Sequence, residues 1–473
     1  MKNNNQKIKV LMAAAECVPF AKVGGLADVV GSLPKALSGQ KVDVRLVLPL
    51  YGVISRQKYK LKKIYSGLEI PSGRVMLRVN IYQGKLPGSD VTVYFIDSKE
   101  YFSKKQVYGK SNHSERFLFF SLAALYAIPC YKWEPQIIHM HDAHVAMMAD
   151  IIKVSRLEYI RDLKTLLTIH NLRYQYADEP MRLSSGNLHL SMLKTLSIDA
   201  EDGDVNFMAQ GILNADIINT VSSTYAEEIL HSAYGASLEK ILRKRRADLY
   251  GILNGIDIDL FNPEIDKNII KNYSAKTLKY KRENKIALQK KFNLPINENI
   301  PVIGFISRLV WQKGLELITE DLNKVKAQFV FLGKGAKKYE RHLEELAKKY
   351  PGQFAVDIGF DLKTAQQIYA SSDFFLMPSR FEPCGLGQMI AMRYGAVPIV
   401  RATGGLKDTV TPAFGFSFEN IEEKELFNSI KKALDLYYEK PEEFAVMQIK
   451  DMKQDFSWNK SAQKYINLYK KLI

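Results

Sequence analysis

The sequence predicts an α/β protein built from two doubly wound halves. Short apolar runs, typical of buried parallel strands, alternate with helical patterns through residues 8–221, and the alternation restarts at residue 302. Asn-Gly and Asn-Pro turns within Asn254–Pro263 mark a boundary between the two series. The 473 residues are enough for two sizeable cores.

The first half begins with a strand, a glycine turn and a helix. We expect its strands at Ile8–Ala14, Val42–Leu48, Val91–Ile96, Ile137–Met140, Thr165–Ile169 and Ile217–Val221. Helical patterns run over Leu26–Leu37, from Glu115 and from His144. The uncharged stretch Phe117–Tyr131 is shorter than the roughly 20 residues that span a bilayer, so we interpret it as a buried helix.

The second half repeats this alternation. We expect its strands at Val302–Ser307, Gln328–Leu332, Phe354–Ile358, Phe374–Met377 and Pro398–Val400. Helices are expected to begin at Gly314 and after Gly385. Apolar residues at helical spacing in Asn459–Leu472 predict a last helix. The predicted organisation is a domain at 1–253, a second domain at 254–455, and a C-terminal helix at 456–473 that packs back across the domains.

Charge and cysteine usage narrow the classes of partner. The net charge of +16 is spread evenly: 33 basic and 24 acidic side chains precede residue 254, and 34 and 27 follow. Nucleic-acid binding needs a basic stripe or cluster, so we expect no nucleic-acid partner. The three cysteines form no CxxC pair and fit a reducing compartment. With no signal peptide, lipidation motif or membrane span visible, we expect a cytoplasmic protein with no membrane partner.

Two basic motifs follow predicted strands. Lys22-Val23-Gly24-Gly25-Leu26 lies between the first strand and its helix, where glycines allow close backbone approach and helix amides attract anions. Arg308 lies at the end of a later strand, and Lys313 lies near the start of the next predicted helix. Two cations at such a point suit a diphosphate, although they could also be ordinary exposed charges on a loop.

A third motif, Pro378–Gln388, follows an apolar strand and opens a helix. Its Glu382 could hold sugar hydroxyls while nearby amides hold phosphate, or it could simply complement the helix dipole. In open α/β sheets, ligands bind at the carboxyl ends of strands. The three motifs therefore predict a ligand cleft there.

The histidine-rich stretch His139-Met140-His141-Asp142-Ala143-His144 raises a rival hypothesis. Metallo-hydrolases of the β-lactamase type carry His-x-His-x-Asp-His, but here the aspartate comes one place early and no other segment supplies further histidines. We therefore expect a polar cleft wall and no metal. Asp257-Ile258-Asp259 resembles a metal-binding Asp-x-Asp, but its place at the domain boundary favours a hinge.

Taken together, the motifs resemble the bacterial glycogen synthase and starch synthase family. The ordered matches are Lys22–Val29, Gly31–Leu37, His141-Asp142, Thr168–Leu172, Gly251–Asp257, Ser307-Arg308-Leu309 with Gln312-Lys313-Gly314, Ser379–Leu386, Thr403–Thr409 and Asp455–Trp458. The resemblance implies a GT-B fold: two Rossmann-like domains facing a cleft. It implies transfer of glucose from ADP-glucose to the non-reducing O4 of an α-1,4-glucan, with retained configuration and no metal or other cofactor.

The resemblance also implies which residues act. The implied catalytic residues are Asp142, His170, Arg308, Lys313 and Glu382. The implied donor-binding residues are Lys22, Gly24, Gly25, Asn171, Asn254, Arg308, Lys313, Phe360, Glu382, Cys384, Gly385, Leu386 and Gly387. Within these sets, Arg308 and Lys313 would neutralise the diphosphate, and Phe360 would lie against adenine. No carboxylate stands out as a nucleophile, so same-face attack assisted by the leaving phosphate is expected.

The sequence departs from the family pattern at a few positions. Ala143 replaces a common Trp, Ala209 replaces a usual Lys, and Gly387 replaces a hydroxyl residue that reaches the diphosphate in many relatives. Two alternatives stay open: a GT-B transferase that uses UDP-glucose or another nucleotide sugar, and a non-catalytic glucan-binding relative. The sequence leaves the oligomeric state unknown.

Overall fold

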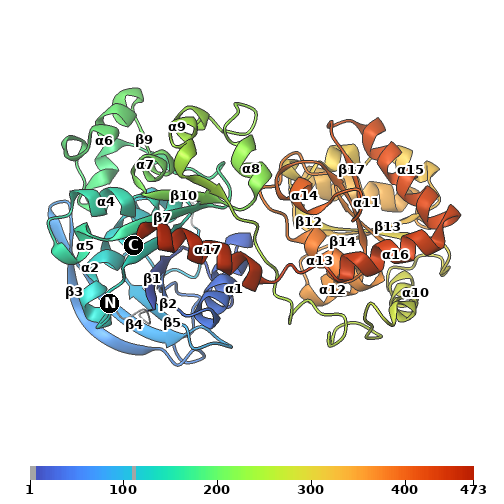
Figure 1. Ribbon diagram of the computed structural model, residues 1–473, viewed down its shortest axis with the longest axis horizontal. Coiled ribbons are helices and arrows are strands. Elements are labelled where there is room, and N and C mark those ends of the chain that lie inside the picture. Colours follow the sequence, from blue (N-terminus) through green and yellow to red (C-terminus); the bar gives the residue numbers. More distant parts are fainter. Residues whose placement is uncertain (1–6, 109–112) are drawn as a thin grey trace. The chain divides into compact units, whose positions relative to one another are not determined.

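The computed structural model describes residues 7–108 and 113–473, and the chain divides into two compact units (Figure 1). Unit 1 comprises Met1–Val221, Ala226–Gly255 and Trp458–Ile473, and unit 2 comprises Ser222–Tyr225 and Ile256–Ser457. Within the described residues, no helix is long and apolar enough to cross a membrane.

One mixed sheet forms the centre of unit 1. Its strand order, within the described residues, is β11-β10-β7-β6-β1-β2-β5-β4-β3. The bounds are β1 Ile8–Ala13, β2 Val42–Pro49, β3 Lys62–Ser72, β4 Val75–Lys85, β5 Thr92–Asp97, β6 Ile137–His141, β7 Lys164–Ile169, β10 Ile217–Thr220 and β11 Leu249–Gly251. The strands from β11 to β5 run parallel, whereas β4 and β3 are antiparallel additions at one edge. A short antiparallel pair lies apart from this sheet, β8 Ala177–Asp178 with β9 Val205–Asn206.

The strand order places a topological switch point between β1 and β6. The chain leaves β1 for β2 on one side, and β6 later pairs with β1 on the other side. Loops that leave such a point diverge and open a crevice at the carboxyl ends of the strands. The loops after β1, β6 and β7 are therefore the places in unit 1 where a ligand is expected.

Helices accompany this sheet. Their bounds are α1 Gly25–Gly39, α2 His113–Tyr126, α3 Ala143–Ala146, α4 Met148–Val154, α5 Glu158–Arg161, α6 Lys194–Asp199, α7 Phe207–Asn214, α8 Ser223–Glu228, α9 Glu239–Lys244 and α17 Trp458–Leu472. The C-terminal helix α17, red in Figure 1, belongs to unit 1 and packs against α1. Its buried residues recur at helical spacing, as the sequence pattern predicts.

Unit 2, whose residues are all described, holds a six-stranded parallel sheet in the order β14-β13-β12-β15-β16-β17. The strands are β12 Val302–Leu309, β13 Gln328–Gly335, β14 Phe354–Ile358, β15 Phe374–Met377, β16 Val397–Arg401 and β17 Phe416–Phe418. The helices are α10 Lys281–Lys291, α11 Lys337–Lys349, α12 Leu362–Ser371, α13 Gly387–Arg393, α14 Gly404–Thr409, α15 Glu423–Glu439 and α16 Pro441–Met452. Its switch point lies between β12 and β15.

The prediction that a helix begins at Gly314 is wrong. Short 3₁₀ turns occupy this stretch at Trp311–Lys313, Leu315–Leu317 and Glu320–Lys324. Gly314 itself has φ of +67°, in the left-handed region, and a Cβ there would lie 1.9 Å from the Pro378 carbonyl oxygen. The glycine thus serves close packing between two loops rather than a helix start.

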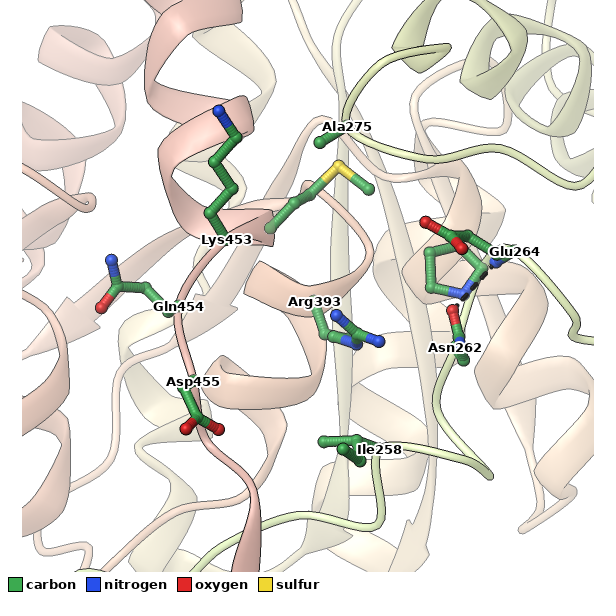
Figure 2. Close-up of a pocket in the computed structure, with 10 residues that line it drawn as sticks. Ile258, Asn262, Glu264, Ala275, Arg393, Lys453, Gln454 and Asp455 are labelled. Atoms are coloured by element: carbon green, nitrogen blue, oxygen red, sulfur yellow. Dashed lines mark hydrogen bonds between the residues drawn. The ribbon is translucent and has the colours of Figure 1, made fainter. Parts of the chain in front are cut away.

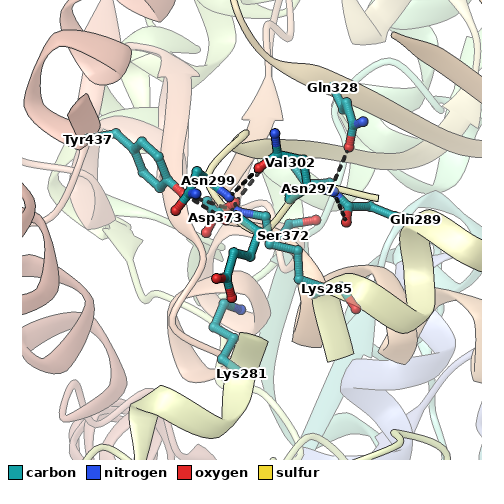
Figure 3. A network of polar contacts seen from close by, with 12 residues as sticks. Lys281, Lys285, Gln289, Asn297, Asn299, Val302, Gln328, Ser372, Asp373 and Tyr437 are labelled. Carbon is teal, nitrogen blue, oxygen red and sulfur yellow. Dashed lines mark hydrogen bonds and ion pairs between the residues drawn. The ribbon is translucent and has the colours of Figure 1, made fainter. Parts of the chain in front are cut away.

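A buried polar network anchors α10 to the sheet of unit 2 (Figure 3). Lys285 Nζ lies 2.8 Å from Asp373 Oδ2, which also accepts a hydrogen bond from the Val302 amide at 2.8 Å. Lys281 Nζ donates to the backbone carbonyls of Tyr369, Ala370 and Tyr394 at distances from 2.8 to 3.1 Å, and burial lowers its pKa to about 7. These contacts satisfy buried cations with fixed oxygen atoms, which holds α10 and the start of β12 in one place.

Candidate functional site

The loop after β1 in unit 1 is organised by a buried acid, Glu16. Its carboxylate accepts hydrogen bonds from the amides of Val23 and Gly24, at 2.6 and 2.8 Å, and from the hydroxyl of Tyr108 at 2.5 Å. Lys22 Nζ lies 2.7 Å from Asp28 Oδ1. The Gly24 amide therefore already has a hydrogen-bond acceptor within the protein, the Glu16 carboxylate. Gly25 begins α1, where the first-turn amides have no intrahelical acceptors.

Asp142 joins the loops after β6 and β7. Its Oδ1 accepts hydrogen bonds from the amides of His170 and Asn171, at 2.7 and 3.4 Å. Its φ of +61° with ψ of 179° is a conformation that non-glycine residues rarely adopt and that costs about 1–3 kcal/mol. Burial raises the pKa of Asp142 to about 7, against the two backbone hydrogen bonds. Strain at the end of β6 is typical of a functional position.

Three histidines contact one another in sequence: His139 and His141 on β6, and His170 directly after β7. His141 Nδ1 lies 2.9 Å from His170 Nε2, and His139 contacts the Thr168 hydroxyl at 2.7 Å. Burial lowers the pKa of both His139 and His170 to about 3, so these imidazoles are neutral at pH 7. Across the described residues, no group of three or more His, Cys, Asp or Glu converges as a metal ligand set.

Asn254, shortly after β11, is the last predicted site residue of unit 1. It is 5% exposed, and within the described residues its Oδ1 atom has no hydrogen-bond partner. A buried polar atom without a partner is costly and rare in native proteins. This oxygen therefore suits a donor group supplied by a ligand.

The predicted cations of unit 2 lie at the end of β12 and in the loop that follows it. Arg308 is exposed at the end of this strand, and the register pairs it with Lys334 on β13. Lys313 Nζ lies 2.5 Å from Glu382 Oε2, which also accepts a hydrogen bond from the Ser379 hydroxyl at 3.0 Å. The carboxylate of Glu382 thus holds the ammonium of Lys313 in a nearly buried pair, while Arg308 remains open to solvent.

Tight backbone packing fixes the loop that carries Glu382. A Cβ at Gly404 would lie 2.1 Å from the Glu382 carbonyl oxygen, and one at Gly405 would lie 2.1 Å from that of Cys384. The Arg401 guanidinium donates to the Arg380 carbonyl at 2.6 Å. Only glycine permits such close approach, so the sequence Gly404-Gly405 and the loop before α13 fit as one rigid unit.

The remaining predicted residues of unit 2 line the ends of β14 and β15. Phe360 is 75% exposed two residues after β14, where a flat ring could cover a base. Cys384 is buried, Gly385 has φ of +72°, and Leu386 and Gly387 lead into α13. The predicted residues of this unit therefore gather at the carboxyl ends of β12, β14 and β15.

A cavity of about 370 Å³ lies elsewhere in unit 2 (Figure 2). Its lining residues are Ile258, Asn262, Pro263, Glu264, Ala275, Arg393, Met452, Lys453, Gln454 and Asp455. None of the predicted site residues lines it. Its lining mixes two cations with two acids, so it offers no net charge to select an anion. We therefore assign the candidate site to the strand ends.

Comparison with known proteins agrees with this geometry. Residues 9–244 match the family described as Starch synthase catalytic domain, and residues 287–449 match Glycosyl transferases group 1. Glycogen synthase of Thermotoga petrophila is 41% identical over 98% of this chain and 99% of its own length. The chain belongs to the glycogen synthase family. Glycogen synthase of Desulforamulus reducens is 43% identical, again over 98% of this chain and 99% of the relative.

Solved structures confirm the fold of this glycogen synthase family member. The catalytic domain of Starch Synthase IV from Arabidopsis thaliana, bound to ADP and acarbose, matches with a TM-score of 0.89 and 33% identity, covering 98% of this chain and 99% of the other. Sucrose-phosphate synthase from Thermosynechococcus elongatus shares the fold, with a TM-score of 0.61 at 17% identity over 98% and 99% of the two chains. The predicted α/β class, GT-B fold and glycosyltransferase activity are therefore confirmed.

Two residues at the strand ends of this glycogen synthase family member, Glu16 and Lys334, were absent from the sequence prediction. A third, His141, was predicted only as part of a polar cleft wall and a matching motif. Glu16 lies three residues after the end of β1 and is buried, which is unusual for a carboxylate, and this signal could have identified it. Lys334 interrupts Gly333-Lys334-Gly335 at the end of β13, and only the pairing of β12 with β13 places it beside Arg308. His141 was considered as part of a metal motif, and its contact with His170 depends on the pairing of β6 with β7.

Proposed function

We propose that this protein transfers glucose from ADP-glucose to the non-reducing end of an α-1,4-glucan, with retained configuration, in glycogen biosynthesis. The observation that carries the proposal is the contrast between the two strand-end sites within one glycogen synthase family chain. The site of unit 2 is cationic and suits a diphosphate, whereas the histidines at the ends of β6 and β7 in unit 1 are neutral and suit a sugar. The ADP and acarbose bound to the starch synthase relative support this choice of donor and acceptor class.

Unit 2 would bind the nucleotide diphosphate. Breaking the glycosyl–phosphate bond places negative charge on the departing diphosphate, and fixed cations stabilise that charge as it develops. Arg308 offers a fork of donors from an exposed position, and Lys313 offers a charge whose place is set by Glu382. Glu382 would also hold hydroxyls of the donor glucose.

Unit 1 would bind the glucose that is transferred. The transferred glucose gains positive charge as its bond to the diphosphate breaks, and the backbone carbonyl of His170 would stabilise that charge. Asp142 is a poor nucleophile, because Oδ1 already accepts two backbone hydrogen bonds and burial favours its protonated form. Same-face attack, with the leaving phosphate removing the proton from the acceptor hydroxyl, therefore accounts best for retention.

The proposal includes no metal and no other cofactor, and it places the enzyme in the cytoplasm without a nucleic-acid or membrane partner. The isolated cysteines, Cys17, Cys130 and Cys384, are all free thiols, which supports a reducing compartment. Activity that survives a chelator would agree with metal-free chemistry, whereas stoichiometric zinc with chelator-sensitive activity would contradict it.

Radiolabelled glucose incorporation into glycogen tests the function directly. The enzyme is incubated with glycogen primer and either ADP-glucose or UDP-glucose at equal concentration. We expect preferential transfer from ADP-glucose. Preference for UDP-glucose would support the alternative donor class, and no transfer from any nucleotide sugar would support a non-catalytic glucan-binding relative.

A further inference from the structure

The contact between His141 and His170 is a hydrogen bond between two neutral rings. His141 Nδ1 and His170 Nε2 are 2.9 Å apart, with the rings stacked at 5.2 Å between centroids and 21° between planes. One proton is shared in this gap, so one ring donates and the other accepts. The choice fixes where His170 carries its own proton, and hence whether its other nitrogen is a donor or an acceptor.

The surroundings of His141 decide which ring donates. Its Nε2 atom is buried and, within the described residues, has no hydrogen-bond partner. If His141 accepted at Nδ1, its proton would be on Nε2, and a buried N–H would lack an acceptor. If His141 donates from Nδ1, only a lone pair is left without a partner. Orphaned buried N–H groups are the rarer and costlier outcome, so His141 donates and His170 carries its proton on Nδ1.

A second hydrogen-bonded chain fixes the His139 ring, which lies next to His141. The Asn219 amide group donates to the Thr220 carbonyl, so its Oδ1 faces Thr168 and accepts that hydroxyl at 2.6 Å. The Thr168 oxygen must then accept the Nε2–H of His139, at 2.7 Å. His139 Nδ1 consequently accepts the hydroxyl of Tyr469 at 2.8 Å. The Thr168 hydroxyl has a single proton, which it donates to Asn219, so the direction of the chain is defined.

This chain ties the C-terminal helix to the histidine pair. Tyr469 belongs to α17, and the His139 ring that it contacts lies 4.2 Å from the His141 ring, centroid to centroid. The His141 side chain is fully buried against the fixed His139 ring, which opposes a flip of the His141 ring. The donor at Nδ1 is therefore held toward His170.

We propose that His141 is a positioning residue that keeps His170 in the Nδ1–H form, so that the partly exposed His170 ring donates a hydrogen bond to a hydroxyl of the transferred glucose. The inference rests on the proposed function, because it assigns a direction to the contact between His170 and the sugar. It explains why a histidine at the end of β6 contacts a histidine directly after β7.

Two substitutions of similar size separate hydrogen bonding from packing. In His141→Asn, the side-chain amide can donate from nearly the same place as Nδ1, whereas His141→Leu fills the space without a donor. We expect the Asn variant to retain kcat within about 3-fold and the Leu variant to lose roughly 10- to 100-fold in kcat with little change in KM for ADP-glucose. Equal kcat values for both variants, with both folded, would overturn the proposal.

A spectroscopic measurement gives a readout that packing alone would not change. In protein labelled with ¹⁵N-histidine, long-range ¹H–¹⁵N correlations report which ring nitrogen carries the proton. We expect a protonated Nδ1 and an unprotonated Nε2 for His170 in the wild type and the Asn variant, and in the Leu variant a changed ¹⁵N shift of Nε2, because that nitrogen then loses the hydrogen bond from position 141. A wild-type His170 protonated on Nε2 would overturn the inference even if glucose transfer from ADP-glucose is normal. Absence of transfer by the wild type would instead contradict the proposed function.

Discussion

The two units treat polar groups at their strand ends in opposite ways. Unit 2 uses ions: an exposed Arg308, a Lys334 beside it, and a Lys313–Glu382 pair. At the ends of β6 and β7, unit 1 uses neutral groups, because burial keeps the histidines uncharged and favours protonation of Asp142. Both sets occupy the same topological place, so the fold determines where a ligand binds, and the residues after each strand determine its chemistry.

The largest effect is expected from the substitution that removes the exposed cation of unit 2, Arg308. We expect Arg308→Ala to lower kcat about 100- to 1000-fold, because the charge that develops on the diphosphate loses a fixed donor. The free energy of unfolding should change by less than about 0.5 kcal/mol, since the side chain is exposed. Initial rates and urea unfolding measure the two quantities.

Lys348→Ala is the matched control, because it removes an exposed cation of unit 2 from the last turn of α11, outside the assigned site. A loss in the control as large as that at Arg308 would mean that overall positive charge, and not a specific diphosphate contact, supports the reaction. Near-normal turnover in Arg308→Ala would contradict the assignment of unit 2.

The second prediction distinguishes Lys313, whose charge is paired with Glu382, from the exposed Arg308. Lys313→Ala leaves the nearly buried Glu382 carboxylate without its counter-ion, so we expect about 3 kcal/mol of lost stability in addition to lost activity. Adding Glu382→Gln should restore most of that stability but not the activity. Urea unfolding of the single and double variants, with glucose transfer assayed alongside, tests the pair. Equal stability of Lys313→Ala and of the double variant would show that the ion pair is not buried in solution.

The third effect concerns the buried acid of unit 1. Because the folded pKa of Asp142, about 7, lies above the unfolded value near 3.9, the folded state binds this proton more tightly. The associated stability is present at low pH and is lost as the pH rises from about 4 to 7. We therefore expect Asp142→Asn to gain in free energy of unfolding, relative to the wild type, by up to about 2.6 kcal/mol between pH 5 and pH 8.

Denaturant unfolding at the two pH values measures this difference. Asp90→Asn provides the control, because Asp90 is exposed and Lys85 lowers its pKa, so no gain with rising pH is expected. A difference between wild type and Asp142→Asn that stays constant with pH would show that this carboxyl is already ionised in the folded protein. The contrast between a neutral and a charged site would then fail.

The sequence predicted most strands of both sheets within one or two residues, because buried parallel strands are continuous apolar runs. It missed the hairpin of β3 and β4, whose exposed face carries no such run. Strand ends could be predicted as sites from topology alone. The contacts of Glu16 with Tyr108 and of His141 with His170 could not, because they join segments 92 and 29 residues apart whose packing a single sequence does not reveal.

The smallest effect is expected from a substitution that restores a hydroxyl at position 387 in the site of unit 2. Gly387 begins α13, and a Cβ there would lie 3.1 Å from Phe375 Cε1 and 3.3 Å from Met377 Sδ, which is tight but open to small adjustments. We expect Gly387→Ser to cost about 1 kcal/mol of stability through this crowding and to tighten ADP binding by roughly 2- to 5-fold through one added hydrogen bond. Gly387→Ala introduces the same crowding without the hydroxyl, so calorimetric ADP affinities of the two variants isolate the hydrogen bond. Equal affinities would show that backbone amides already satisfy the diphosphate at this turn, and that unit 2 relies on its cations more heavily than the family pattern implies.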